Sequence, residues 1–208
     1  LDLWYTPSLV ATDEFLANFS ILAHVLKESL DFRPHHYIID GSKFRCQGNT
    51  DSTNSSCYKM CTNNGRYCAV STRIEGEAVV KESLRRMCLR KHHTPEVFWQ
   101  YLNHFHTLCQ SKDFFTSEEC VKDVYKHTNI KEDVIDDCMK DSGDLEKDVE
   151  NTHLSDAMKY SGAVVEYPTL WINGLPFQWP LQTKFVFEAF CNGFVPGKAP
   201  HVCFACGS

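Results

Sequence analysis

The sequence predicts an α/β fold in which a long, cysteine-rich segment separates two parts of one sheet. Three observations lead to this prediction. The first 44 residues follow a strand, helix, strand order, residues 76–140 have helical periodicity, and residues 160–195 contain a hairpin followed by a helix. A strand-helix-strand order argues for a partly parallel sheet, because such a crossover returns the chain to the same sheet.

The opening unit is defined by its hydrophobic pattern. "LDLWYTP" alternates apolar and polar residues up to Pro7, which predicts a short strand. Thr12 and Asp13 are an N-cap signal for a helix over about 12–30, where apolar residues recur at helical spacing. "PHHYIID" predicts a second strand, which ends before Gly41.

The middle of the chain changes composition twice. From Arg45 to Arg73 it is polar and contains four cysteines, which predicts a loop-rich segment held by disulfides. Residues 76–140 predict three or four short helices, with Ser117 as the N-cap of the third. The acidic stretch 141–150 is expected to be a loop or an irregular helix.

The closing segment contains the strongest local signal. "AVVEYPTLWINGLPFQWP" consists of two β-rich runs joined by Asn173-Gly174, which predicts a β-hairpin. "LQTKFVFEAFCNGF" then predicts a helix that ends at Asn192-Gly193, and a proline-rich tail follows.

Composition indicates the compartment and excludes several classes of partner. The 208 residues include eleven cysteines, which indicates an oxidising compartment, either the secretory lumen or the cell exterior. Only Cys203 and Cys206 form a C-x2-C pair, so we expect neither a metal nor another cofactor. The formal net charge of −6, with both signs mixed along the chain, argues against nucleic acid as a partner.

The sequence has no candidate membrane segment. No apolar run approaches the roughly 20 residues that span a bilayer, and the first residues lack the features of a signal peptide. We therefore expect no direct membrane insertion within this chain, a signal already removed, and any anchor outside the chain. Two sequons, at Asn18 and Asn54, predict N-glycosylation, with Asn54 in the more favourable polar loop.

The hairpin phrase "YPTLWING" is similar to that of thioredoxin and DsbA-type proteins, in which a cis proline precedes the hairpin. Pro168 occupies this position. Cys46 lies where the nucleophile of those enzymes would be, but Asn49 replaces the resolving cysteine of a C-x-x-C motif. Cys57 and Cys61 have C-x3-C spacing. We therefore expect no catalytic residue and no redox enzyme.

The same segments resemble the thioredoxin-like luminal region of plant-type vacuolar sorting receptors, which lies between a protease-associated domain and EGF repeats. The matching phrases are "PHHYI", "CYKMCTNNGRYCA", "VFWQYLNHFHTLC", "YPTLWINGLPF", "FCNGF" and "HVC". The family's Trp-Tyr-Cys-Pro phrase is replaced here by Phe-Arg-Cys-Gln at 44–47. Ten cysteines fall at family positions and are expected to form disulfides, although spacing alone leaves their pairing open: Cys46, Cys57, Cys61, Cys68, Cys88, Cys109, Cys120, Cys138, Cys191 and Cys203.

The resemblance implies a thioredoxin-like fold with an inserted, disulfide-stapled helical subdomain. The expected core is 1–44 and 160–195, the insertion is 45–159, and the tail is 196–208. In thioredoxin-like proteins the residue before the cis proline pairs with an extended peptide. Tyr167, Pro168, Thr169 and Trp179 are therefore the expected binding residues for proteins or extended peptides, whereas Trp171 is expected to lie in the core.

Three functions follow from these patterns. The favoured one is a non-catalytic luminal or extracellular protein-binding module that resembles a sorting receptor cargo domain. The first alternative is a structural subunit of an extracellular assembly, joined through Cys206 or the C-terminal tail. The second is a divergent DsbA-like thiol-disulfide oxidoreductase that uses Cys46. Ten histidines favour solvated or pH-responsive side chains over a metal site.

Overall fold

The sheet that organises the molecule has four strands in the order β2-β1-β6-β7. The computed structural model describes residues 1–49, 57–162, 164 and 166–205. β1 pairs with β2 in parallel, and the other two pairs are antiparallel. The strands are β1 (Asp2–Tyr5), β2 (Arg33–His36), β6 (Thr169–Ile172) and β7 (Leu175–Pro176).

The predicted opening unit is confirmed as β1, α1 (Val10–Leu26) and β2. Leu3 and Tyr5 are fully buried, whereas Asp2 on the alternate face is partly exposed. This alternation follows from the pleat, which directs successive side chains to opposite faces. The apolar face therefore packs against helices.

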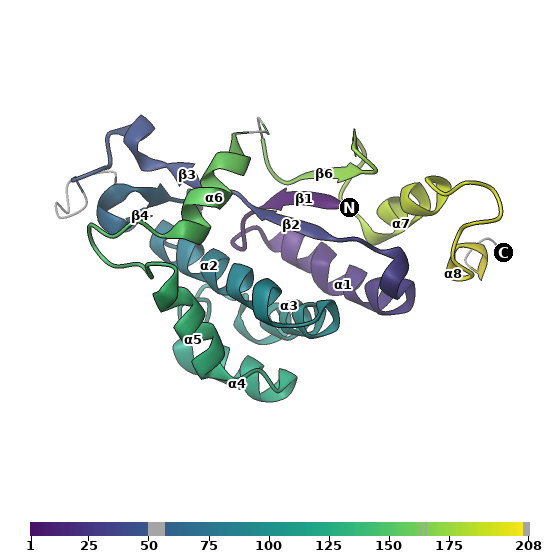
Figure 1. The fold of residues 1–208 in the computed structure, drawn as a ribbon, viewed down its shortest axis with the longest axis horizontal. Coiled ribbons are helices and arrows are strands. Elements are labelled where there is room, and N and C mark those ends of the chain that lie inside the picture. The colour runs from purple at the N-terminus through teal and green to yellow at the C-terminus, as the bar shows by residue number, and fades with distance from the viewer. Residues whose placement is uncertain (50–56, 163, 165, 206–208) are drawn as a thin grey trace.

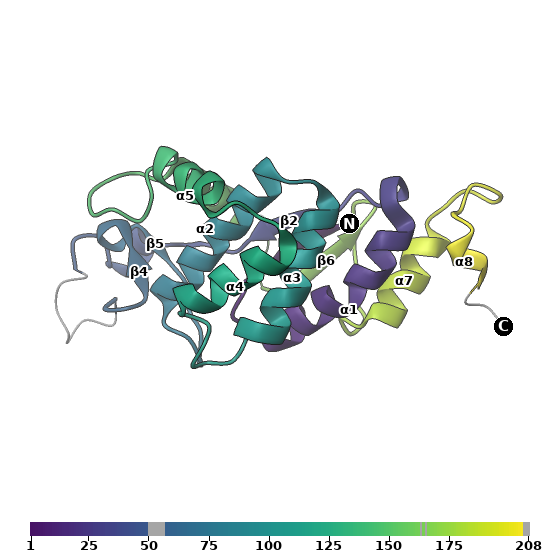
Figure 2. The same ribbon diagram turned by 90° about the horizontal axis from the view of Figure 1, so that it is seen from below.

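Helices α1, α2 and α3 lie together on one side of this sheet (Figures 1 and 2). Four helices occupy the segment predicted to hold three or four, and the Oγ of Ser117 caps the third by accepting the N–H of Cys120 at 3.2 Å. None of the helices described here is long and apolar enough to cross a bilayer. The remaining helices are α2 (Gly76–His92), α3 (Pro95–Cys109), α4 (Glu118–Thr128), α5 (Glu132–Asp141), α6 (Thr152–Ser161), α7 (Thr183–Asn192) and α8 (Val202–Ala205).

The prediction of a single strand over "PHHYIID" is wrong in one respect, because this segment is divided between two sheets. The N–H of Tyr37 still donates to Tyr5, but the N–H of Ile38 donates to the Oγ of Ser161 at 2.9 Å. The chain then enters a second sheet, in the order β3-β5-β4. Its strands are β3 (Ile39–Asp40), β4 (Cys61–Thr62) and β5 (Tyr67–Cys68).

The predicted start of one helix also needs correction, and another helix was missed. α1 begins at Val10, so Thr12 and Asp13 lie buried inside the helix rather than at its cap. α6 was not predicted, although Asn151 caps it by accepting the N–H of Leu154 at 2.9 Å. Short 3₁₀ helices are η1 (Lys27–Ser29), η2 (Gly41–Phe44) and η3 (Asn63–Gly65).

Disulfides join segments that are both near and far in sequence. Cys88–Cys138 spans 50 residues and links α2 to α5. Each bond stabilises the fold by about 2–4 kcal/mol, mainly by limiting the unfolded chain. The other pairs are Cys46–Cys57, Cys61–Cys68, Cys109–Cys120 and Cys191–Cys203.

A buried ion network connects the helices. Arg86 of α2 donates to both carboxylate oxygens of Asp13 in α1, at 2.8 and 3.3 Å, and its Nε donates to Glu82 at 2.9 Å. Arg85 binds the other Glu82 oxygen at 2.6 Å, and the hydroxyl of Tyr101 in α3 donates to the same carboxylate. Two guanidinium groups thus balance two carboxylates in an apolar interior, as buried charges require.

Aromatic rings enclose this network. The guanidinium of Arg86 lies 5.0 Å from the ring centre of Phe105 and 5.9 Å from that of Tyr5. Burial raises the pKa of Tyr5 to about 12, although Arg86 opposes the shift. Burial also raises the pKa of the Asp13 carboxyl, and the positive charge of Arg86 again acts in the opposite direction.

Arg86→Met should destabilise the protein strongly. The change leaves the buried Asp13 carboxylate without its counter-ion, and losing one partner of such a pair costs about 3–5 kcal/mol of unfolding free energy. Denaturant unfolding measures this loss. Arg33→Met is the matched control, since Arg33 pairs with Asp31 on the surface and its loss should leave the midpoint unchanged. Equal midpoints for the two variants would contradict the structural role of the network.

Candidate functional site

The β6–β7 hairpin carries the residues expected to bind a partner. The predicted hairpin is confirmed, with Trp171 opposite Pro176 and Ile172 opposite Leu175. Asn173 and Gly174 at its turn have φ values of 51° and 79°, the positive values that a two-residue hairpin turn of this type needs. The Tyr167–Pro168 peptide bond that leads into β6 is cis.

Tyr167, Pro168 and Thr169 lie together at the start of β6. The ring of half-buried Tyr167 packs on that of Tyr37, with centroids 4.2 Å apart, and burial raises the pKa of its hydroxyl. Pro168 is exposed, and the Thr169 hydroxyl donates to the carbonyl of Glu166 at 2.7 Å. The local hydrogen bond and the ring contact hold this corner in place.

Trp179 lies beyond β7, in a second patch. Its side chain is 70% exposed, and its nearest aromatic contact is Phe185 of α7, at 6.2 Å between ring centres. Tyr167 and Trp179 therefore contact different neighbours. Beside Trp179 is a shallow groove of about 620 Å³ lined mainly by apolar residues of the hairpin and α7, among them Ile172, Leu175 and Ala189.

Sequence reasoning missed the aromatic residues on the second face of the sheet. The ring of Trp4 stacks on His35, with centroids 4.3 Å apart, and lies 5.9 Å from Trp171. His35 Nε2 is 3.0 Å from Asp2, while Trp4 Nε1 donates to the carbonyl of Tyr160. The alternation in "LDLWYTP" places Asp2 and Trp4 on the face opposite Leu3 and Tyr5. It does not show which strands would lie beside them.

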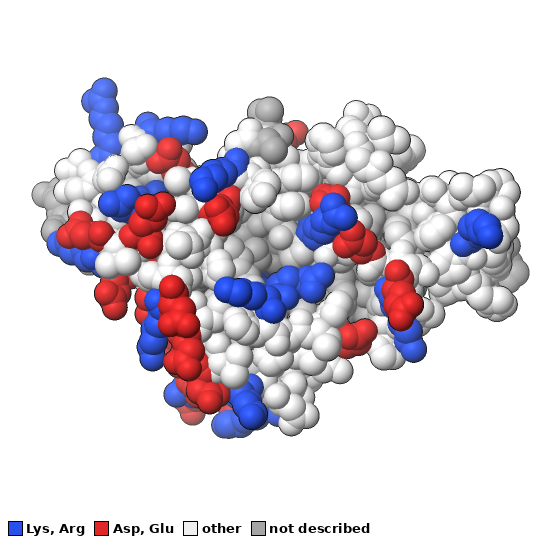
Figure 3. Space-filling view, viewed as in Figure 1, with Lys and Arg blue, Asp and Glu red and all other residues white. Residues whose placement is uncertain are grey.

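Charge is distributed unevenly over the surface. Residues 167–205 contain only three charged side chains, Lys184, Glu188 and Lys198. The end of the molecule formed by α7 and α8 is almost wholly uncharged on the face shown, whereas acidic and basic side chains gather over α4 and α5 (Figure 3). Within residues 167–205, Leu175 of β7 and Val195 after α7 are 71% and 70% exposed. Such a surface fits an apolar or neutral partner.

Several predicted sites fall elsewhere. Asn18 lies on the exposed side of α1, remote in sequence from the hairpin. Asn54 and Cys206 are outside the residues that the structure describes. Cys46 forms a disulfide with Cys57, so the oxidoreductase arrangement with a free Cys46 thiol is not found.

Metal-type ligand atoms cluster at two places in the described part of the chain. One group is Cys46, Cys61 and Cys68, and the other is Cys88 and Cys138 with His153. Every cysteine in both groups is disulfide-bonded. A disulfide sulfur has no thiolate to offer a metal, so the oxidised protein does not present these cysteines as ligands.

A comparison with protein families matches residues 3–191 to the vacuolar sorting receptor thioredoxin-like domain. The chain belongs to this family. The thioredoxin-like fold is therefore established, as a mixed helix and sheet structure with disulfides. The resemblance drawn from the sequence is confirmed.

Curated relatives of this vacuolar sorting receptor domain come from two plants. Vacuolar-sorting receptors 5 and 7 of Arabidopsis thaliana are 30% and 31% identical, over 91% and 93% of the chain. Vacuolar-sorting receptor 1 of Pisum sativum is 29% identical over 92% of the chain. The alignment covers 32% of each relative, so the chain spans about a third of their length.

His36 of the domain is a buried histidine without a hydrogen-bond partner on either ring nitrogen among the described atoms. It is 3% exposed and packs against Tyr5, with ring centres 4.9 Å apart. Burial lowers the pKa of His36 well below its ordinary value, and the charges of Arg86 and His35 act in the same direction. The folded protein thus keeps this imidazole neutral.

Acidification below about pH 6.5, the ordinary histidine pKa, should destabilise the domain. There the unfolded chain binds a proton at His36 that the folded chain does not, so the unfolding free energy falls by at most about 1.4 kcal/mol per pH unit. His93 and His153, whose pKa values burial also lowers, add to this slope.

Denaturant midpoints between pH 7 and 5 measure the effect. His36→Phe fills the same apolar space without a titratable group, so its stability should fall less with acid than that of the parent. His201→Phe, at an exposed position, is the control and should retain the parental slope. A His36→Phe slope equal to the parental one would show that His36 does not carry the pH dependence.

Proposed function

We propose that this chain is a non-catalytic, receptor-like module of the secretory lumen that binds proteins through the β6–β7 hairpin. The observation that carries the proposal is the exposed apolar surface around Leu175 and Trp179, with half-buried Tyr167 and exposed Pro168 in a separate patch at the start of β6. The names of the relatives, vacuolar-sorting receptors, support a receptor role. Five disulfides support an oxidising lumen.

The proposed organisation follows the sequence boundaries. Residues 1–44 and 160–195 form the thioredoxin-like core, 45–159 form an inserted helical subdomain, and 196–208 form a tail. The pairing of β1 with both β2 and β6 supports this division, because β6 joins the sheet from the far end of the chain. Strands β4 and β5 of the second sheet and its two disulfides lie in the inserted part, whereas β3 lies in the core segment 1–44 and joins the two.

The proposed partner is an extended segment with apolar, neutral side chains. Trp and Tyr are the side chains that most often dominate binding energy at protein interfaces. Trp179 offers a large exposed ring beside the groove, and Tyr167 offers a ring held by Tyr37. Pro176 has no N–H to donate, so the hairpin edge would contribute side-chain contacts more than strand addition.

Absence of redox catalysis is part of the proposal. Cys46, at the nucleophile position of the resemblance, is 2% exposed and bonded to Cys57. A thiol-disulfide oxidoreductase needs an accessible thiolate at this place. The buried disulfide at Cys46 thus favours binding over catalysis.

The test begins with peptides selected from a random display library on the immobilised chain. Trp179→Ala should weaken the binding of a selected peptide about tenfold or more, as loss of an aromatic anchor of 1.4 kcal/mol or above predicts. Tyr167→Ala should also weaken it. Fluorescence anisotropy with labelled peptide gives the dissociation constants.

Phe114→Ala is the control for these variants. Phe114 is 55% exposed in the loop between α3 and α4, so the substitution removes an exposed aromatic ring from another part of the surface. Its affinity should equal that of the parent. Unchanged binding by Trp179→Ala and Tyr167→Ala, or an equal loss in Phe114→Ala, would contradict the proposed site.

A further inference from the structure

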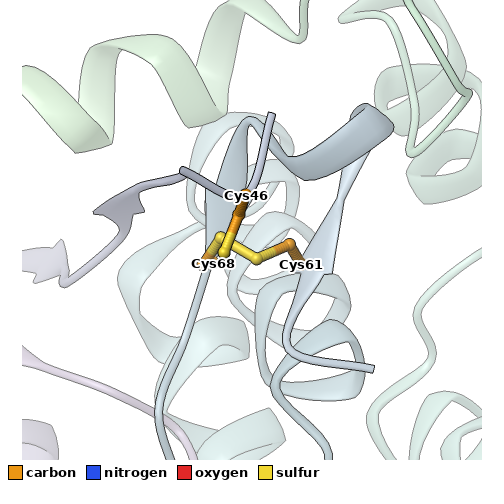
Figure 4. Close-up of side chains that lie close together, drawn as sticks. All are labelled: Cys46, Cys61 and Cys68. Atoms are coloured by element: carbon orange, nitrogen blue, oxygen red, sulfur yellow. A yellow bond between two sulfur atoms is a disulfide. The ribbon is translucent and has the colours of Figure 1, made fainter. Parts of the chain in front are cut away.

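Two disulfides of the second sheet lie against each other. The sulfur atoms of Cys46, Cys61 and Cys68 are all within 4.8 Å of one another. Cys61 and Cys68 are bonded to each other, and the side chain of Cys46 points at their bond (Figure 4). The partner of Cys46 is Cys57, so four cysteines form one contiguous sulfur cluster.

Backbone pairing brings these cysteines together. Cys61 and Cys68 are directly opposite in β4 and β5, and the N–H of Cys46 donates to the carbonyl of Gly41 at 2.9 Å. A Cβ added at Gly41 would clash with the backbone carbonyl of Gly65 and would lie 2.8 Å from the sulfur of Cys68. Glycine at position 41 thus lets the backbone and the cluster pack closely.

The cluster is dry. All four cysteines are at most 6% exposed, and the other side chains packed on them are those of Ile39 and Met60. Such an environment raises the pKa of a thiol and slows its reaction with external reagents. It does not prevent reaction with a neighbouring disulfide, because the reacting sulfurs are already held in proximity.

We propose that these four cysteines form an internal disulfide-exchange unit. A low-molecular-weight monothiol such as glutathione first attacks Cys57, forms a mixed disulfide with it and releases the Cys46 thiolate. This thiolate attacks one sulfur of the Cys61–Cys68 bond; a new bond to Cys46 forms, and the other cysteine leaves as a thiolate. The released thiolate then attacks the mixed disulfide at Cys57 and expels the monothiol.

The exchange is balanced. Two protein disulfides are present before and after it, the monothiol is recovered, and no net oxidation takes place. The product is a crossed pairing in which Cys46 is joined to Cys61 or Cys68. The exchange gives these four cysteines a second covalent state. This state does not depend on the partner binding proposed above.

The other disulfides differ in their surroundings. Among the described cysteines, neither Cys109–Cys120 nor Cys191–Cys203 has a third sulfur within this range, and Cys88–Cys138 has the ring of His153 instead. Exchange is therefore specific to the cluster. This difference supplies an internal control.

The variant Cys57→Ser tests the step directly, because it leaves Cys46 as a thiol beside the intact bond. The full chain is held at about pH 8, where thiolates form, then quenched in acidic denaturant with an alkylating reagent. Non-reducing peptide mapping should show bonds from Cys46 to Cys61 or Cys68, with the displaced cysteine alkylated. Their yield should rise with time. Alkylation of Cys46 with the Cys61–Cys68 bond intact at every time would overturn the proposal.

Cys120→Ser is the matched control, since it releases Cys109 from a bond with the same separation of 11 residues. Cys206, which belongs to none of the five disulfides, is scored separately; Cys109 should be alkylated with no new bonds in this variant, and equal scrambling in both variants would overturn the proposal. Circular dichroism establishes that each variant is folded. If Cys57→Ser does not fold, the parent chain is incubated in a glutathione buffer and mapped in the same way. Crossed bonds confined to these four cysteines would support the exchange, and the absence of crossed bonds would contradict it.

Discussion

The salt bridge between Arg86 and Asp13 is the interaction on which the rest of the structure depends. It joins α2 to α1 inside the core, while Glu82 and Tyr101 extend the same network to α3. Buried charges are costly unless their partners are present, so the network favours the helix arrangement in which Asp13, Glu82 and Arg86 meet. Since α1 follows β1, that arrangement also positions the sheet.

Disulfide bonds reinforce the helix arrangement that the ion network favours. Cys88 lies two residues after Arg86 and joins α2 to α5, so the same helix carries both the central ion pairs and the longest disulfide loop. The cysteine at the nucleophile position of the resemblance serves the scaffold instead. The proposed recognition surface lies outside this framework, on the β6–β7 side, where Trp179 is exposed.

Local signals predicted local structure well. The hairpin at Asn173-Gly174 and the cap at Ser117 depend on residues adjacent in sequence, and both are confirmed. Asp13 was misjudged because a buried carboxylate and an N-cap look alike until Arg86, 73 residues away, is in place. The division of the strand after His36 likewise depends on a distant hydrogen bond from Ile38 to Ser161.

Hydrogen-deuterium exchange with and without a selected peptide tests the central claim most directly: a rigid helical framework presents the hairpin as the binding surface. The account predicts slower exchange over 167–179 in the complex and unchanged exchange in α2, whose amides should be protected in both states. Protection gained mainly over α2 to α5, with none at the hairpin, would contradict it.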